Sequence, residues 1–220
     1  MLTRCSILPL LLLLAATAPA GADTLLTVKT RVEGLNMPGQ SPEGEVRIWV
    51  AGDRLRRDDG EISYLLRLDQ GKLYILNHGD KTYTALTLAD LEKSQGDPLK
   101  TSIQVTPTGE TRKIKGWNAR KYKVRISNVT GLDLETTTWA STDVESHGAL
   151  TRLAVSLSAL QPGGAVWGRE LAKIEGFPVL NESSVTMSGS RFTTREELVA
   201  VAEKEAPAGQ YDPPAGYTAR

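Results

Sequence analysis

The sequence contains very little cysteine and histidine. One cysteine, Cys5, and two histidines, His78 and His147, occur among 220 residues. Cys5 precedes the N-terminal apolar run instead of lying at a cleavage point, where a lipid-anchored protein would need it. Removal of that segment leaves a chain without a thiol, which excludes disulfides, thiolate metal sites and a cysteine nucleophile. The histidine and cysteine ligands that a zinc site requires are also missing.

Catalytic and nucleotide-binding motifs are missing as well. The chain has no Gly-x-Ser-x-Gly turn, no glycine-rich phosphate loop followed by lysine, and no dinucleotide fingerprint. His78 falls in a predicted turn and His147 at a helix start, where polar residues are common for backbone reasons. We therefore expect no catalytic residue, no metal and no cofactor, and a protein that is not an enzyme. A hydrolase with an unrecognised site near His147 is the remaining enzymatic alternative.

The chain has one long apolar run, and it lies at the N-terminus. Arg4 precedes an apolar stretch from Ile7 to Ala16, and Ala20-Gly21-Ala22 provides the small residues that a signal peptidase reads. This run has about half of the roughly 20 residues that a membrane-spanning helix needs. We interpret residues 1–22 as a signal peptide cleaved after Ala22. The mature protein is then periplasmic or secreted, neither lipid-anchored nor an integral membrane protein.

The charge of the mature chain is close to zero. Removal of 22 of the 220 residues leaves 198, with 25 basic and 26 acidic side chains. A length of this order suits one domain with its own core, and two small domains are the alternative. Because no global field would attract a polyanion, we expect no nucleic-acid partner.

Regularly spaced glycine turns predict a β meander over residues 24–86. The turn glycines are Gly52, Gly60, Gly71 and Gly79, a spacing typical of sequential antiparallel strands. The strand after Gly60 alternates, with Ile62, Tyr64, Leu66 and Leu68 on one face. Leu65 and Leu76 break the alternation, so both faces are partly apolar and we expect another segment to cover the second face.

The rest of the chain mixes strands and helices. Strands are predicted at 103–106, 111–115, 120–127 and 132–141. Helices are predicted at 87–93, after Ser146 and, more weakly, at 166–174; the helix after Ser146 carries a stripe of Leu150, Leu153, Ala154, Leu157 and Leu160. Residues 194–205 fit either a strand or a helix. We predict a single antiparallel β domain at 23–206 and a proline- and glycine-rich tail at 207–220.

The densest charge feature lies at 112–125, with seven basic side chains and no acidic one. Lys121, Lys123 and Arg125 are the candidates for binding an anionic partner such as lipid headgroups or a polyanion. The structural alternative is simple alternation, in which Tyr122, Val124 and Ile126 face the core and the basic residues face water.

Several segments carry a resemblance through their order and spacing. They are Arg67–Tyr74 with Lys81–Tyr83, Gly109–Trp117 with Lys121–Val124, Gly176–Val179 and Pro214–Tyr217. Together they are similar to a family of secreted bacterial domains of unknown function, allied in fold to the LolA and LppX lipoprotein carriers. The resemblance implies an α+β fold, mainly antiparallel β, in which helices cover the concave face of a curved half-barrel sheet. It carries over no site residue.

An apolar cavity between sheet and helices would suit a lipid-like ligand, because each buried methylene gains about 0.8 kcal/mol. The candidate cavity residues are Trp49, Leu66, Leu68, Trp139, Leu153, Leu157 and Trp167. Core filling is the alternative role of Trp49 and Trp139. We therefore expect an exported binding protein for an apolar or amphiphilic ligand. The alternative function is a cell-envelope interaction or scaffolding protein with a protein partner and no small-molecule ligand.

Overall fold

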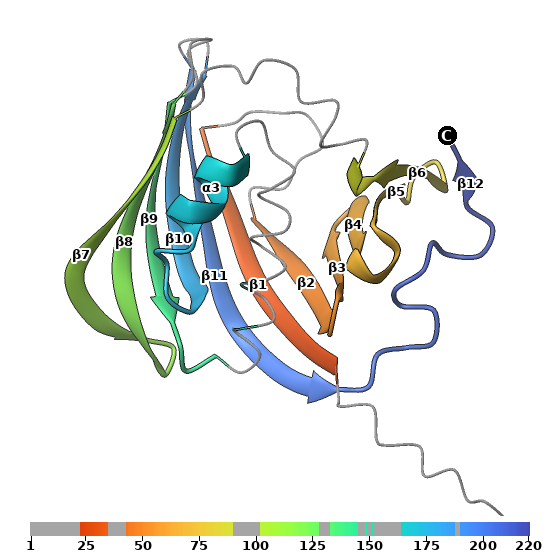
Figure 1. The fold of residues 1–220 in the computed structure, drawn as a ribbon, viewed down its shortest axis with the longest axis horizontal. Coiled ribbons are helices and arrows are strands. Elements are labelled where there is room, and N and C mark those ends of the chain that lie inside the picture. Colours follow the sequence, from red (N-terminus) through yellow and green to blue (C-terminus); the bar gives the residue numbers. More distant parts are fainter. Residues whose placement is uncertain are drawn as a thin grey trace, which may run out of the picture.

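The computed structural model describes residues 23–34, 43–89, 102–127, 133–144, 148, 151, 164–187 and 190–220. Their strands form one twelve-stranded sheet in the order β12-β6-β5-β4-β3-β2-β1-β11-β10-β9-β8-β7. The strands are β1 (Asp23–Glu33), β2 (Glu43–Ala51), β3 (Arg54–Asp59), β4 (Ile62–Arg67), β5 (Lys72–Asn77), β6 (Thr82–Thr87), β7 (Ser102–Ile114), β8 (Trp117–Ser127), β9 (Asp133–Ser141), β10 (Phe177–Met187), β11 (Ser190–Lys204) and β12 (Thr218–Ala219). The helices are the 3₁₀ turn η1 (Leu68–Gln70) and α3 (Gly164–Leu171). Figure 1 shows the sheet bending around α3, with β7–β9 on one side and β2–β6 on the other.

The predicted α+β class, with helices covering the concave face, is wrong. Most described residues belong to strands of this one sheet, and α3 is eight residues long. It corresponds to the weak helix predicted at 166–174. Of the helix predicted at 87–93, Thr87 is the last residue of β6, Leu88 and Ala89 are helical, and residues 90–93 lie outside the described residues. In the helix predicted after Ser146, Gly148 and Thr151 are helical, and the leucine stripe from Leu150 to Leu160 lies outside the described residues.

The curvature of the sheet brings strands from its two halves around one core. Leu66 on β4, Val46 on β2 and Leu198 on β11 belong to one buried cluster, the inner core, together with residues of β8–β10. Strands from both halves of the sheet thus supply apolar side chains to the same core, and much of the burial comes from the sheet itself.

The ambiguous segment 194–205 is a strand. It forms most of β11, which pairs antiparallel with β1 on one side and β10 on the other. Thr194 and Glu197 match a capping box, but pairing with β1 as far as Lys204 and with β10 as far as Glu197 outweighs that local preference.

The predicted meander is confirmed as β2–β6, and its turns use glycine as expected. Gly52, Gly60 and Gly71 adopt positive φ angles of 56°, 62° and 61°, which cost glycine little. The fourth turn differs, because Lys81 and not Gly79 takes the left-handed conformation there, with φ of 53°.

The second apolar face of the meander is covered, as its sequence predicted, and the covering segment is the C-terminal one. Tyr211 packs with Trp49, Leu65, Tyr74 and Leu76 in a buried group that we call the outer cluster. Leu65 and Leu76, the two residues that broke the alternation, are fully buried there. Residues 206–220 are therefore part of the packed structure, although β12 is only two residues long.

Polar contacts hold the C-terminal segment to the sheet. The Arg67 guanidinium donates to the Tyr211 carbonyl at 2.8 Å and to the Asp212 carboxylate at 2.6 Å. The Arg54 guanidinium lies 4.7 Å from the centre of the Tyr211 ring. The hydrogen bonds that Arg67 donates to Asp69 and, with a smaller effect, to Asp212 raise the pKa of Arg67.

The other end of the sheet is covered by α3. Trp167, Leu171 and the following Ile174 pack on a buried group from β7, β8 and β9. Glu170 accepts a hydrogen bond from the Val105 backbone N–H at 2.8 Å, which occupies a donor on the edge strand β7. Pro107, the next residue but one, has no N–H. The free edge is thereby less able to pair with another strand.

We expect Gly176→Ala to destabilise the fold by more than the ordinary cost of positive φ. Gly176 has a φ of 94°, and a Cβ there would lie 2.3 Å from the Ser141 carbonyl. The matched control is Gly60→Ala, at φ of 62° with no atom within 4 Å of the added carbon. Urea unfolding should show a loss of about 1–2 kcal/mol for the control and a further 1–3 kcal/mol or so for Gly176→Ala. Equal losses would contradict the close approach.

The Glu170 carboxylate should make the stability of the fold depend on pH in the acid range. A hydrogen bond from Lys173, and then the Val105 N–H, lower the pKa of Glu170. A lowered folded-state pKa means that the stabilisation is present above the ordinary glutamate pKa and is lost as pH falls through the lowered value. We expect the Glu170→Gln variant to lose less stability than the wild type when the pH falls from about 5 to about 3. Thermal unfolding at each pH measures this difference. Identical pH slopes would show that this carboxylate contributes nothing.

Tyr211 anchors the C-terminal segment through its buried ring. Tyr211→Ala should lower the free energy of unfolding by about 3–5 kcal/mol, because it removes a buried ring from the outer cluster. Tyr211→Phe keeps the ring and should cost much less. Chemical denaturation measures both, and a wild-type stability for Tyr211→Ala would mean that the C-terminal segment is not part of the cooperative unit.

Candidate functional site

An apolar pocket of about 270 Å³ lies at the concave face, where the end of α3 meets the middle strands of the sheet. Val28, Ile48 and Leu198 form the sheet wall from β1, β2 and β11. The opposite wall and one end are formed by Leu171, Ile174, Phe177 and Pro178. Because these residues come from α3, β10 and the turn between them, the pocket exists only when the sheet has closed around α3.

The rim of this apolar pocket is polar. Arg57 on β3 and Glu196 on β11 form an ion pair at 3.0 Å, and Arg57 also contacts Asp59 at 3.3 Å. Asn181 lines the same space, and among the described residues its buried side-chain oxygen has no hydrogen-bond partner. The pocket therefore joins an apolar interior to a charged and hydrogen-bonding entrance, which is the arrangement that an amphiphile requires.

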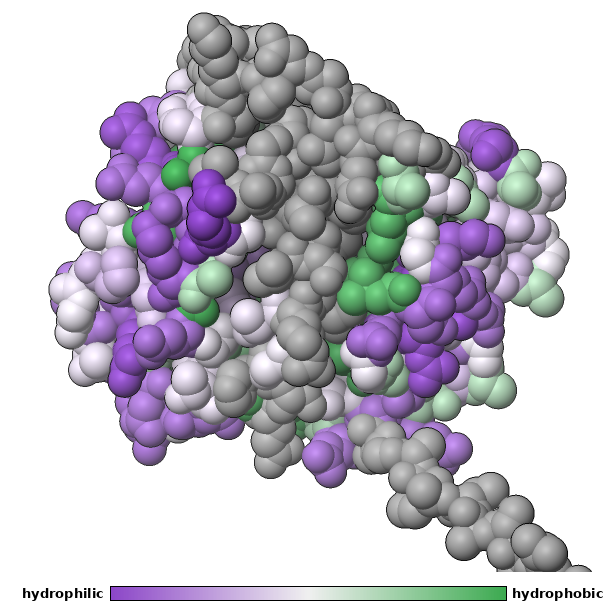
Figure 2. Space-filling view, viewed as in Figure 1, coloured by the Kyte–Doolittle hydropathy of each residue, from purple (hydrophilic) through white to green (hydrophobic). Residues whose placement is uncertain are grey.

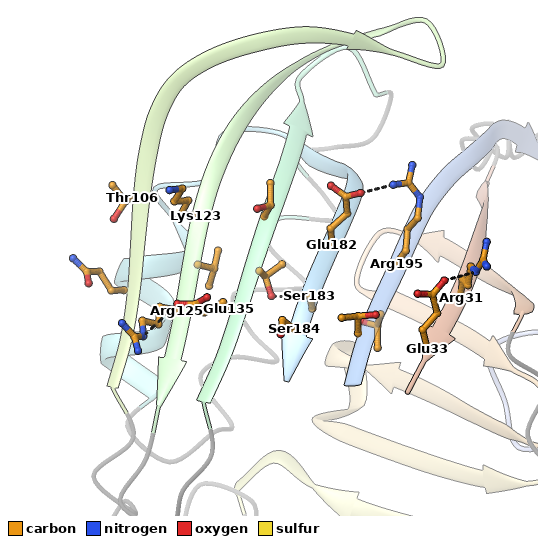
Figure 3. A pocket seen from close by; sticks show the side chains of 16 residues that line it. Arg31, Glu33, Thr106, Lys123, Arg125, Glu135, Glu182, Ser183, Ser184 and Arg195 are labelled. Carbon is orange, nitrogen blue, oxygen red and sulfur yellow. Dashed lines mark hydrogen bonds and ion pairs between the residues drawn. The ribbon is translucent and has the colours of Figure 1, made fainter. Parts of the chain in front are cut away.

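A second and larger space, of about 740 Å³, lies on the opposite face of the sheet. We call it the polar hollow. Figure 3 shows its lining side chains, which come from β7, β8, β9, β10, β11 and β1. Lys123 and Arg125 point into it, whereas the alternating residues Tyr122, Val124 and Ile126 are buried toward α3. The predicted alternation of basic and apolar side chains along β8 is confirmed.

Charges in the polar hollow are mostly paired. Arg31 contacts Glu33 at 2.9 Å, Arg195 pairs with Glu182, and Arg125 lies 3.9 Å from Glu135. The hydrogen bonds that Arg125 donates to Asp133, followed by the negative charges of Asp133 and Glu135, raise the pKa of Arg125. Within the described part of the chain, Lys123 is the lining cation for which we find no ion pair.

The predicted basic patch is thus divided. Lys123 and Arg125 belong to the polar hollow, but Lys121 contacts Glu110 at 2.9 Å and lies above the Trp139 ring. Arg120 pairs with Glu175, and Lys115 reaches Glu197 at 3.9 Å. Acidic side chains from distant segments therefore neutralise much of the positive charge that stands alone in the sequence.

The candidate cavity residues fall in several places. Leu66 is buried in the inner core and Leu68 packs against it, while Trp49 belongs to the outer cluster. Trp139 is buried beneath the Arg112 guanidinium, which lies 4.0 Å from its ring centre. Trp167 packs on β7–β9 from α3. Leu153 and Leu157 lie outside the described residues, and neither described space is lined by the other five.

His78 takes part in a hydrogen-bonded chain at the back of the meander. Its ring nitrogens contact the Ser63 hydroxyl and the Tyr217 hydroxyl, each at 2.6 Å, and the Ser63 hydroxyl donates to Asp58 at 2.5 Å. Ser63 is fully buried, so this arrangement fastens the C-terminal segment and presents no accessible nucleophile.

The described residues contain no group of three or more histidine, cysteine, aspartate or glutamate side chains placed to hold a metal ion. No helix among them is long and apolar enough to cross a membrane. Figure 2 shows hydrophobic residues gathered over β3, β4 and the end of β6, beside a largely hydrophilic surface over β7–β9.

Fold and site together define an all-β protein with an apolar space on the inside of one curved sheet. The chain belongs to the family described as a domain of unknown function, DUF4412, which matches residues 58–217. The match extends through Tyr211 into the C-terminal segment, in keeping with its place in the packed structure. The predicted membership in a family of domains of unknown function is confirmed. No protein with a curated description matches the chain.

Two solved structures are distantly similar. The crystal structure of MucB has 13% sequence identity and a TM-score of 0.34, over 90% of this chain and 59% of MucB. The chain therefore spans less than two thirds of that protein. A putative outer membrane lipoprotein-sorting protein domain from Vibrio parahaemolyticus has 7% identity and a TM-score of 0.33, over 86% of this chain and 89% of that domain.

Proposed function

We propose that this protein is an exported, non-enzymatic binding protein that holds the apolar part of an amphiphilic, lipid-like ligand in the apolar pocket. The observation that carries the proposal is the combination of apolar walls from β1, β2, β11 and the α3 end with the Arg57–Glu196 rim. An acyl chain placed among Val28, Ile48 and Leu198 would leave water, and its head would meet the rim.

The size of the pocket limits the ligand. Its volume of about 270 Å³ lies just below the roughly 300–1,000 Å³ typical of small-molecule pockets. A single alkyl chain fits this space better than a lipid with several chains. At about 0.8 kcal/mol per buried methylene, a chain of about ten methylenes gains about 8 kcal/mol before the cost of immobilisation is subtracted.

The proposal includes export. Residues 1–22 carry the pattern of a signal peptide, so the ligand would be met in the periplasm or outside the cell. Native mass spectrometry of the protein, purified from its own envelope without detergent, tests both the cleavage of the signal peptide and the presence of a bound ligand. We expect a polypeptide that begins at Asp23 and carries an acyl species near one-to-one ratio. A mass with neither feature would contradict the proposal.

A binding assay tests the pocket itself. Ile174→Trp should fill the apolar pocket, and the matched control Leu134→Trp enlarges a partly buried residue that packs against the same strands without lining the pocket. We expect Ile174→Trp to weaken binding of a fluorescent dodecanoic acid derivative by about tenfold or more, the equivalent of losing a few buried methylenes. The control should stay within about twofold.

The outcome that would contradict the proposal is failure of the wild type to bind the probe, or equal weakening by both substitutions. Circular dichroism and thermal unfolding establish that each variant is folded before affinities are compared. If a variant loses both binding and structure, Leu171→Met replaces it in the test. This volume-conserving change in the pocket lining should alter the affinity for the probe without unfolding the protein.

A further inference from the structure

We propose that the polar hollow is a second binding site and that it takes an elongated, hydroxyl-rich glycan carrying carboxylate groups. This inference is independent of the apolar pocket, since the two spaces lie on opposite faces of the sheet and share no lining residue. Figure 3 shows the floor of the hollow as a continuous sheet surface from β7 to β1.

The strand register arranges this floor as two polar rows that cross six strands. The first row is Thr106, Lys123, Thr137, Glu182, Arg195 and Arg31. The second row is Gln104, Arg125, Glu135, Ser184, Thr193 and Glu33. Every residue in both rows can donate or accept a hydrogen bond. Neighbouring strands lie about 4.8 Å apart, so each row offers a polar group at that interval over about 24 Å.

Solvent-facing strands often carry threonine and paired charges for solubility alone. The hollow differs from an ordinary outer face because the β7–β8 hairpin bends over it, as Figure 3 shows. The pairing of β7 with β8 shifts register between Pro107 and Thr111, which permits the bend. Arg112 over the Trp139 ring and Lys115 beside Glu197 hold the hairpin tip down.

The balance of charge and polarity selects the ligand class. Val124, whose side chain is buried on the α3 side of β8, is the one apolar residue among the sixteen that line the hollow, so an acyl chain would find no wall of apolar side chains. The lining has four cations, Arg31, Lys123, Arg125 and Arg195, against the three acids Glu33, Glu135 and Glu182. A net charge of one is too small for a nucleic acid or an anionic membrane, which require several unpaired cations.

A peptide strand is also unsuitable. The hollow lies over strands whose backbone groups are paired with neighbours on both sides from β8 to β1, and added strands bind at free edges. A glycan instead presents hydroxyls at regular intervals along an extended chain, which matches the rows. Lys123, which has no ion pair among the described residues, would meet a carboxylate of the glycan, and the Arg–Glu pairs would contact its hydroxyls.

The test is titration of ¹⁵N-labelled protein with trigalacturonate and, separately, with neutral galactotriose, at about 0.15 M ionic strength. We expect saturable shifts from trigalacturonate at residues of β8–β11 that line the hollow, and binding about tenfold weaker for galactotriose. Lys123→Ala should weaken trigalacturonate binding by about tenfold. The matched control is Lys113→Ala, an exposed lysine on β7 outside the hollow, which should have little effect.

Each of three titration outcomes would overturn the proposal: no binding of trigalacturonate at millimolar concentration, shifts confined to other surfaces, or equal effects of Lys123→Ala and Lys113→Ala. Vesicles of phosphatidylglycerol serve as a competing probe. Lys123-dependent binding to vesicles without binding to trigalacturonate would assign the hollow to a membrane and also overturn it. Dodecanoic acid binding should be unchanged in Lys123→Ala, so the result is separate from that for the apolar pocket.

Discussion

The pairing of β1 with β11 is the interaction on which the rest of the structure depends. It joins the meander β2–β6 to the strands β7–β10, so that one continuous sheet can curve around α3. The same two strands supply both candidate sites. Val28 and Leu198 face the apolar pocket, whereas Arg31 and Arg195 face the polar hollow. Because strand residues alternate between faces, one ladder of hydrogen bonds places an apolar surface and a polar surface back to back.

Local signals made the meander predictable. Glycine turns and alternating side chains are properties of short segments, and they placed β2–β6 correctly before any long-range contact was considered. Even the misfit of Leu65 and Leu76 was informative, because it predicted a covered second face. The cover itself, Tyr211, was not predictable, since a short proline-rich segment has no periodicity that would indicate its partner. Residues 194–205 illustrate the same limit, because pairing with β1 and β10 decides their conformation.

The candidate sites were harder to predict than the fold. Trp49 and Leu66 were reasonable cavity residues by size and polarity, yet curvature buries Leu66 in the inner core and the C-terminal segment buries Trp49. The apolar pocket draws Val28, Ile174 and Leu198 from segments far apart in the sequence. Its nearest signal was Gly176-Phe177-Pro178-Val179, one of the several segments whose order and spacing give the family resemblance. The rows of the polar hollow depend on register between six strands, which no single segment encodes.

Register is also what keeps the two surfaces apart. A shift of β1 by one residue against β11 would turn Val28 outward and bring Arg31 into the core, while Leu198 and Arg195 of β11 kept their faces. Burial of an unpaired guanidinium group would cost far more than the hydrogen bonds of the ladder could repay. The alternation of apolar and charged side chains along these two strands therefore selects a single register. This register also determines how the sheet curves around α3, and it fixes the opposite face of the sheet, on which Lys123 lies.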